Sequence, residues 1–234
     1  MLNKKFKNII ILIVILINSC SYPEIVRDEL VYFNDFEENN LINIHGGAIS
    51  KFDESYVLGN FNSESFSLHI ENVGDHDYVF VSFDLYIHGT WDGNFNGFEN
   101  NDKPDKWGIE FNPDMTLFKD RSTDLFITTF SNSPCFSNYC LRQSYPNTYP
   151  YENPPKTGHY ETNLTKVCHN SFFGGETTLY KFEKGFRSSG NALVIRFFDE
   201  LYQPNAIDQD GNIQSKCDES WSIDNLSVRV VSYK

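Results

Sequence analysis

The sequence predicts an all-β fold, a two-sheet antiparallel β-sandwich of the jelly-roll type. Strong helix formers are scarce, with three alanines against 21 Phe and 13 Tyr in 234 residues. Aromatic residues instead favour strands. Short alternating segments recur between clusters of Gly, Asn, Asp and Pro. A sheet with one apolar face must bury that face, so these strands predict a second sheet packed on the first.

The N-terminal segment is typical of an export signal. Lys4, Lys5 and Lys7 precede an uncharged apolar run at residues 9–17. A basic start, a short apolar core and small residues before a cleavage point define such a signal. A run of about nine residues is too short for a membrane span, which takes about 20. We therefore expect residues 1–19 to be removed on export.

Cys20 is the expected lipidation site. Residues 16–20, Leu-Ile-Asn-Ser-Cys, resemble a bacterial lipobox, in which cleavage before the Cys leaves that residue to carry a lipid. This predicts a protein anchored at the cell surface or outer membrane, with residues 20–29 as a tether and residues 30–234 as the folded domain. The alternative is an ordinary signal peptide followed by an incidental Cys, which gives a secreted protein.

The charge balance limits the partners. The formal net charge is −13 at pH 7, from 19 basic and 32 acidic residues. Such a chain repels nucleic acid and anionic lipid. We therefore expect no nucleic acid partner, and contact with a membrane only through the N-terminal lipid.

The clearest strand lies at residues 78–87. Val79, Val81 and Phe83 alternate with more polar residues, which is the period of a strand with one buried face. Similar runs predict strands at residues 64–70, 106–111, 124–130, 177–184, 192–198 and 221–231. The absence of helical segments between them favours a sandwich over a parallel sheet.

The first and last strands each carry carboxylates. The segment YFNDFEENN (residues 32–40) includes Glu37, and DESWSIDNLSV (residues 218–228) includes Asp218 and Asp224. We expect these strands to lie together, where the carboxylates repel one another unless a cation relieves them. Because Ca²⁺ binds oxygen ligands, the three acids are predicted to hold a structural Ca²⁺ ion.

A second oxygen-rich stretch is WDGNFNG (residues 91–97), with Asp92 and Asn94 at alternating positions. It begins like an EF-hand loop, but Lys103 stands at the position of the bidentate Glu, so it is not an EF-hand. We predict a further cation cluster at Asp92 and Asn94. A solvated hairpin turn explains the same residues without a metal, here and at the similar residues 208–212.

Residues 131–176 interrupt the strand pattern and carry three of the five cysteines. With Cys20 lipidated or removed, four cysteines remain in an oxidising compartment, which predicts two disulfides. The economical pairing joins Cys135 to Cys140 and Cys168 to Cys217, and crossed pairings stay open. Zinc is the alternative, because the Cys-x4-Cys pair at Cys135 and Cys140, together with Cys168 and its neighbour His169, offers four soft ligands.

Aromatic residues in turns are the candidates for ligand contact. Trp91 lies in a polar turn, and Tyr145 and Tyr149 lie in a Pro- and Asn-rich loop. Exposed flat rings can stack on sugar faces, so these three are the predicted ligand-binding residues. The alternative is that the loop packs onto its own domain. Trp221, at strand spacing from Ile223, is expected in the core.

Several motifs, in order, resemble a recurring concanavalin A-like jelly-roll domain of secreted surface proteins. They are FDLYIHGTWDGN (residues 83–94), PDKW (104–107), TTFSN (128–132), QSYP (143–146) and DESWSIDNLSV (218–228). The segments around Glu37 and Asp224 also resemble the ends of MAM domains and of calcium-stabilised carbohydrate-binding modules, although Asn225 stands where those have a second acid. The resemblance implies the fold, export and structural calcium.

No catalytic motif supports an enzyme. The chain lacks a Glu-x-Asp-x-x-Glu strand, a Gly-x-Ser-x-Gly turn and a phosphate-binding glycine loop. We therefore predict a non-catalytic surface module that binds carbohydrate, with a polysaccharide or a surface glycoprotein as its partner. The alternative is a structural or protein-adhesion domain of the envelope or matrix without a small ligand. A glycan-active enzyme is a further alternative that no motif favours.

Overall fold

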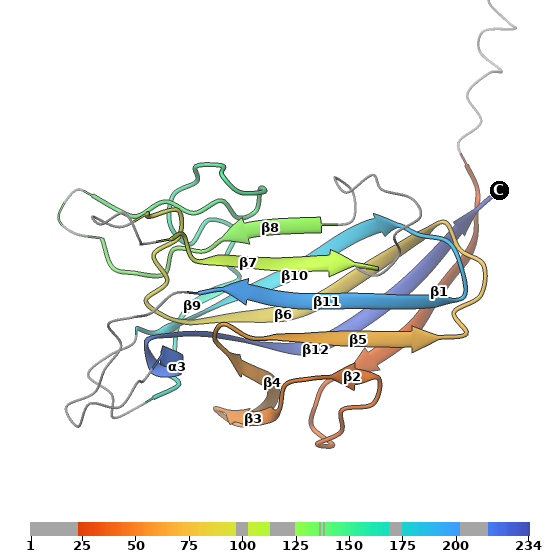
Figure 1. The fold of residues 1–234 in the computed structure, drawn as a ribbon, viewed down its shortest axis with the longest axis horizontal. Coiled ribbons are helices and arrows are strands. Elements are labelled where there is room, and N and C mark those ends of the chain that lie inside the picture. Colours follow the sequence, from red (N-terminus) through yellow and green to blue (C-terminus); the bar gives the residue numbers. More distant parts are fainter. Residues whose placement is uncertain are drawn as a thin grey trace, which may run out of the picture.

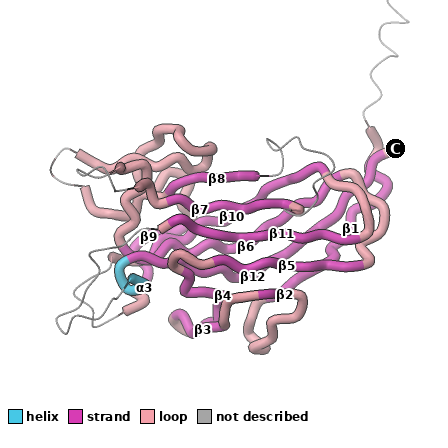
Figure 2. Tube along the Cα trace, viewed as in Figure 1, coloured by secondary structure: helices cyan, strands magenta, loops and turns pink. Residues whose placement is uncertain are grey.

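The structure is a computed structural model that describes residues 23–96, 103–112, 125–135, 137, 139–168, 175–201 and 215–234. These residues form two antiparallel sheets that enclose a hydrophobic core (Figure 1). The described part of the chain contains one helix, α3 (Ser215–Asp218), of four residues, and the rest is strand and loop (Figure 2). The predicted all-β, two-sheet sandwich is confirmed.

The first sheet has seven strands, with β12 and β6 near its centre. Its order is β3 (Ile49–Phe52), β4 (Ser55–Phe61), β12 (Glu219–Tyr233), β6 (Tyr78–Gly89), β10 (Thr177–Arg187) and β9 (Glu161–Leu164). The seventh strand, β1 (Ile25–Asn34), pairs with the second half of β12, beyond the part that pairs with β4. The first and last strands therefore lie together, as predicted.

The second sheet has five strands. Its order is β2 (Ile44–His45), β5 (Ser65–Glu71), β11 (Ala192–Glu200), β7 (Lys106–Phe111) and β8 (Leu125–Thr129). Its register places Phe198 opposite Gly108 and Arg196 opposite Glu110. Directly opposite residues of an antiparallel pair project to the same face. These four residues share the outer face of the sheet.

The core is built from alternate residues of each strand. In β6, Val79, Val81 and Phe83 are buried and the residues between them are half-buried, as the alternation predicts. Trp107 from one sheet and Trp221 from the other meet edge to face, with ring centroids 5.9 Å apart. The expectation that Trp221 lies in the core is confirmed.

The folded domain begins before the predicted boundary. β1 starts at Ile25, so residues 25–29, assigned to a tether, belong to a sheet. Four of its first five residues are exposed, so this part lacks the alternation that marks a half-buried strand. The predicted signal peptide, Cys20 and the loop at residues 208–212 lie outside the described residues.

Candidate functional site

The structure buries two of the three predicted contact residues. Trp91 is 0% exposed and Tyr145 is 8% exposed, so the prediction that both rings are available to a ligand is wrong. The Trp91 indole N–H donates to the backbone oxygen of Ser220 at 3.0 Å. Tyr145 packs against Phe130, with ring centroids 5.0 Å apart. Tyr149 is half-buried and keeps part of its ring accessible.

Side-chain amides hold the long loop after β8 against the sandwich. The amide oxygen of Gln143 accepts hydrogen bonds from the backbone N–H groups of Ser131 at 3.1 Å and Lys156 at 2.8 Å. The Asn153 amide donates to the backbone oxygen of Ser144 at 2.9 Å. The loop thus packs onto its own domain, as the alternative interpretation holds. Its rim still exposes the rings of Tyr139, Tyr151 and Tyr160.

Both predicted disulfides are present. Cys135 is bonded to Cys140, and Cys168 is bonded to Cys217 across 49 residues of sequence. The second bridge fastens the long loop to α3, directly before β12. The zinc alternative is wrong, because the four sulfur atoms are bonded to one another in pairs.

Two of the predicted Ca²⁺ ligands, Glu37 and Asp224, lie within electrostatic range of each other. Burial raises the pKa of Asp224 to about 6, a backbone hydrogen bond opposes the shift, and the carboxylates of Asp84, Glu37 and Asp35 add to it. Glu37 accepts hydrogen bonds from a serine hydroxyl and a backbone N–H, which lower its pKa. A cation at this position would relieve the repulsion that Asp224 experiences.

Asp218 does not join this pair. The extended strand from Glu219 to Asp224 rises by roughly 17 Å, which keeps the two aspartates apart. Asp218 lies instead near Asp92 and the buried Asp105, and burial raises the pKa of all three carboxyls. The predicted grouping of Asp218 with Glu37 and Asp224 is therefore wrong.

Asp92 and Asn94 have different partners. The Asp92 carboxylate accepts a hydrogen bond from the Ser133 hydroxyl at 2.6 Å, and its backbone N–H donates to the Asp105 carboxylate at 2.5 Å. The Asn94 amide oxygen accepts a hydrogen bond from the Thr129 hydroxyl at 2.5 Å. Among the residues that the structure describes, no group of three or more His, Cys, Asp or Glu has a geometry that could hold a metal ion.

A ligand-binding candidate that the sequence did not reveal lies on the outer face of the five-stranded sheet. Phe198 projects from β11, and the end of its ring covers Gly108, where a β-carbon would be only 2.5 Å from the ring. The guanidinium carbon of Arg196 lies 5.0 Å from the ring centroid, over its face. Arg196 is also paired with Glu110 at 3.5 Å. Ring, cation and carboxylate form one triad.

A second triad adjoins the first. The ammonium group of Lys106 lies 5.4 Å from the ring centroid of Tyr149 and 2.9 Å from the carboxylate of Glu200. The Tyr149 backbone N–H donates to the oxygen of Ile127 in β8 at 2.8 Å, which holds the loop at the sheet edge. We call the two triads together the triad surface. It comprises Lys106, Glu110, Tyr149, Arg196, Phe198 and Glu200.

The register makes the triads contiguous. Arg196, Phe198 and Glu200 occupy successive outward positions of β11, and β7 supplies the partners directly opposite. Successive outward positions on a strand are roughly 7 Å apart. The triad surface therefore presents two rings, two cations and two carboxylates on neighbouring rows of one sheet face.

The seven-stranded sheet carries comparable triads farther apart. Phe80 lies over Gly185, beneath Arg229, which pairs with Asp28 at 2.8 Å. In the second, Lys181 lies 4.6 Å from the ring centroid of Tyr160 and pairs with Asp84 at 3.0 Å. Because position 84 of β6 lies four residue steps, roughly 13 Å, beyond position 80, these triads do not adjoin. They serve as natural controls for the triad surface.

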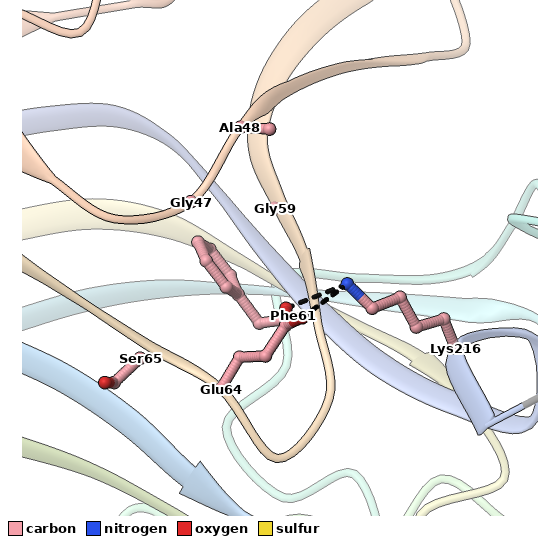
Figure 3. Close-up of a pocket in the computed structure, with 7 residues that line it drawn as sticks. All are labelled: Gly47, Ala48, Gly59, Phe61, Glu64, Ser65 and Lys216. Atoms are coloured by element: carbon pink, nitrogen blue, oxygen red, sulfur yellow. Dashed lines mark hydrogen bonds and ion pairs between the residues drawn. The ribbon is translucent and has the colours of Figure 1, made fainter.

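The structure also contains a small cavity at the edge between the sheets, near β4 and α3. Its volume is about 430 Å³, and its lining includes Phe61, two glycines, Glu64 and Lys216. Figure 3 shows the Lys216 ammonium reaching the Glu64 carboxylate, and the two oxygens accept its hydrogen bonds at 2.8 and 2.9 Å. Phe61, the aromatic residue of this lining, is 1% exposed, whereas Phe198 and Tyr149 of the triad surface are half-buried and keep part of each ring accessible. The triad surface is therefore better equipped to stack on a ligand.

No protein-family model, curated protein or solved structure matches this chain. In the described part of the chain, no helix has both the length and the apolar character of a membrane span. The site must therefore be interpreted from its own chemistry.

Most residues of the triad surface were missed because the sequence places them in three separate segments. The alternation in KWGIEF (residues 106–111) and in residues 192–200 does carry a signal. Lys106 and Glu110 in the first segment, and residues 196, 198 and 200 in the second, stand at positions that alternate with the core residues. Only the strand register then reveals that Arg196 faces Glu110 and that Lys106 faces Glu200.

Proposed function

We propose that this protein is a non-catalytic, lipid-anchored cell-surface module that binds a polysaccharide on the triad surface. The observation that carries the proposal is the contiguity of the two triads, which brings Phe198 and Tyr149, both half-buried, to the same outer face of the sheet. An aromatic ring offers an apolar face to the C–H groups of a sugar, and its polar neighbours can bond the hydroxyl groups.

The charges of the triad surface favour a neutral glycan. Arg196 and Lys106 are each already paired with a carboxylate, so neither is a free cation for an acidic sugar. The whole chain has a formal net charge of −13, which repels a polyanion. Paired cations and carboxylates still offer hydrogen-bond donors and acceptors close together, which suits adjacent hydroxyl groups.

The presence of two separate rings on the triad surface favours a polymer over a single sugar. Stacking on one ring contributes about 1 kcal/mol, so a monosaccharide would bind weakly. A repeating chain engages both triads at once and gains affinity from the second contact. The proposal thus keeps Tyr149 from the predicted contact residues and replaces Trp91 and Tyr145 with Phe198.

Affinity electrophoresis in gels containing neutral plant, algal or host polysaccharides tests the proposal. We expect at least one polysaccharide to retard the wild-type protein. Phe198→Ala and Tyr149→Ala should each weaken binding about five-fold, the equivalent of about 1 kcal/mol per ring. Phe80→Ala is the matched control, because it removes a ring over a glycine and beneath an arginine on the other sheet.

Two results would contradict the proposal. If Phe80→Ala weakens binding and Phe198→Ala does not, the glycan site lies on the seven-stranded sheet. If no polysaccharide retards the protein, the alternative of a structural or protein-adhesion domain gains support. Circular dichroism of each variant separates loss of binding from loss of fold.

A further inference from the structure

Two histidines lie against each other on the outer face of the five-stranded sheet. His45 projects from β2 and His69 from β5, with ring centroids 4.2 Å apart and ring planes inclined by 43°. His45 is exposed and His69 is half-buried. Their strands are paired, because His45 lies opposite Ser67, two residues before His69. The two imidazoles therefore share one side of the sheet, and both are at least partly accessible to solvent.

The other described histidines are committed to hydrogen bonds. Both ring nitrogens of His76 and of His88 contact protein oxygens at 2.8 to 3.0 Å, and one nitrogen of His159 contacts a backbone oxygen at 2.7 Å. Within the described residues, no hydrogen-bond partner is found for either ring of His45 or His69. Their nitrogens are thus free to bind something other than the protein.

We propose that His45 and His69 together bind a divalent transition-metal ion such as Zn²⁺, Ni²⁺ or Cu²⁺. Imidazole nitrogen is a favoured ligand of these ions, whereas Ca²⁺ prefers oxygen. Rotation of the two side chains aims one nitrogen of each ring at a common ion. The two imidazoles supply two ligands and water fills the remaining positions.

A metal at this position would fasten a weak edge of the sheet. β2 has two residues and pairs with β5 only at Ile44 with Leu68 and His45 with Ser67. An ion bound to one histidine from each strand links the two strands directly. Because the ion binds the folded state, it raises stability by mass action. This site is independent of the triad surface and of the proposed glycan binding.

Titration with Zn²⁺ and with Cu²⁺ tests the site on the full chain, purified without a polyhistidine tag. Calorimetry should show one equivalent bound by the wild type. His45→Ala and His69→Ala should each weaken binding about ten-fold or more, since each removes a direct ligand. His159→Ala is the matched control and should bind as the wild type does, because that histidine is exposed and no ring of the described residues lies against it.

Two further measurements keep the test decisive. Electron paramagnetic resonance of the Cu²⁺ form should report two nitrogen ligands in the wild type and one in either variant. His169→Ala is made in parallel, because His169 lies outside the described residues. The proposal is overturned if the wild type binds neither ion, or if His169→Ala loses the ion while His45→Ala and His69→Ala retain it.

Discussion

Phe198 lies opposite Gly108 across β11 and β7, and its ring occupies the space where any other residue at position 108 would place a β-carbon. Gly108 has ordinary strand dihedral angles, so an alanine there is free of backbone strain. Glycine at position 108 thus leaves space for the Phe198 ring, and the backbone conformation there does not require it. This relationship gives a substitution that moves Phe198 without removing it.

Gly108→Ala should weaken polysaccharide binding about five-fold while leaving the fold intact. The added β-carbon would lie 2.5 Å from the ring, so Phe198 must swing away from its present position. The lost stacking is about 1 kcal/mol. Affinity electrophoresis measures the loss, and thermal unfolding checks the fold.

Gly185→Ala is the paired control for this experiment. It displaces Phe80 on the other sheet, where the β-carbon would lie 2.9 Å from the ring. Equal weakening by both substitutions would indicate a general effect on the sandwich rather than a site at Phe198.

The two disulfides should differ in their contribution to stability. Closing a loop lowers the entropy of the unfolded chain and so raises the free energy of unfolding. The expected gain is about 4 kcal/mol for the 49-residue separation of Cys168 and Cys217 and about 2 kcal/mol for the 5-residue separation of Cys135 and Cys140. Replacing each pair with serine and measuring denaturant unfolding gives the two values. A larger loss of stability on replacing Cys135 and Cys140 than on replacing Cys168 and Cys217 would contradict the entropic account.

The alternation of apolar residues in the sequence was enough to predict most of the fold. It predicts which face of β6 is buried, and the four cysteines other than Cys20, in a chain that we expect to be exported, predict two disulfides. The pairing of the first and last strands followed from their matching composition. These features are local or depend on counting, so the sequence alone shows them.

The site was less predictable because it depends on contacts between distant segments. Trp91 is in a polar turn, yet the Ser220 oxygen at 3.0 Å satisfies its indole N–H inside the protein. Asp105 is buried beside Asp92, although 13 positions separate them in the chain. The triads require both the register of β7 with β11 and the path of the loop that brings Tyr149 to β8.

Cys20 should be the lipidated N-terminus of the mature protein. The lipobox-like residues 16–20 motivate this prediction. Cys20→Ala should then move the protein from the membrane fraction to the soluble fraction of the cell. Mass spectrometry of the purified protein gives a direct check, and an unmodified start at another residue would disprove lipidation.

Asp224 should make the stability depend on pH between about 4 and 6. Its carboxyl has a pKa of about 6 in the folded protein and an ordinary value near 3.9 when unfolded. The folded state therefore binds more protons in this window, and stability falls as the pH rises through it. Asp224→Asn removes this effect.

The substitution should accordingly raise the melting temperature above pH 6 and leave it nearly unchanged below pH 4. Asn keeps an oxygen to accept the hydrogen bond from the Asn225 N–H, which is 2.7 Å long in the wild type. Melting curves of both proteins from pH 3.5 to 8 provide the test. A constant difference across this range would rule out titration of Asp224 as the cause.

Calcium should offset the loss of stability that the ionised Asp224 carboxylate causes. We propose that Ca²⁺ binds between Glu37 and Asp224, with backbone oxygens and water as the remaining ligands, as Ca²⁺ commonly requires. Bound Ca²⁺ offsets the repulsion at Asp224, so millimolar Ca²⁺ should raise the melting temperature of the wild type relative to excess EDTA.

Asp224→Asn should then be more stable than the wild type in EDTA and gain little from Ca²⁺. Asp218→Asn should respond to Ca²⁺ as the wild type does, because Asp218 lies near Asp92 instead. Equal melting temperatures of the wild type in EDTA and in Ca²⁺ would contradict the site, whereas a gain lost in Asp218→Asn would place the ion in the other group of carboxylates.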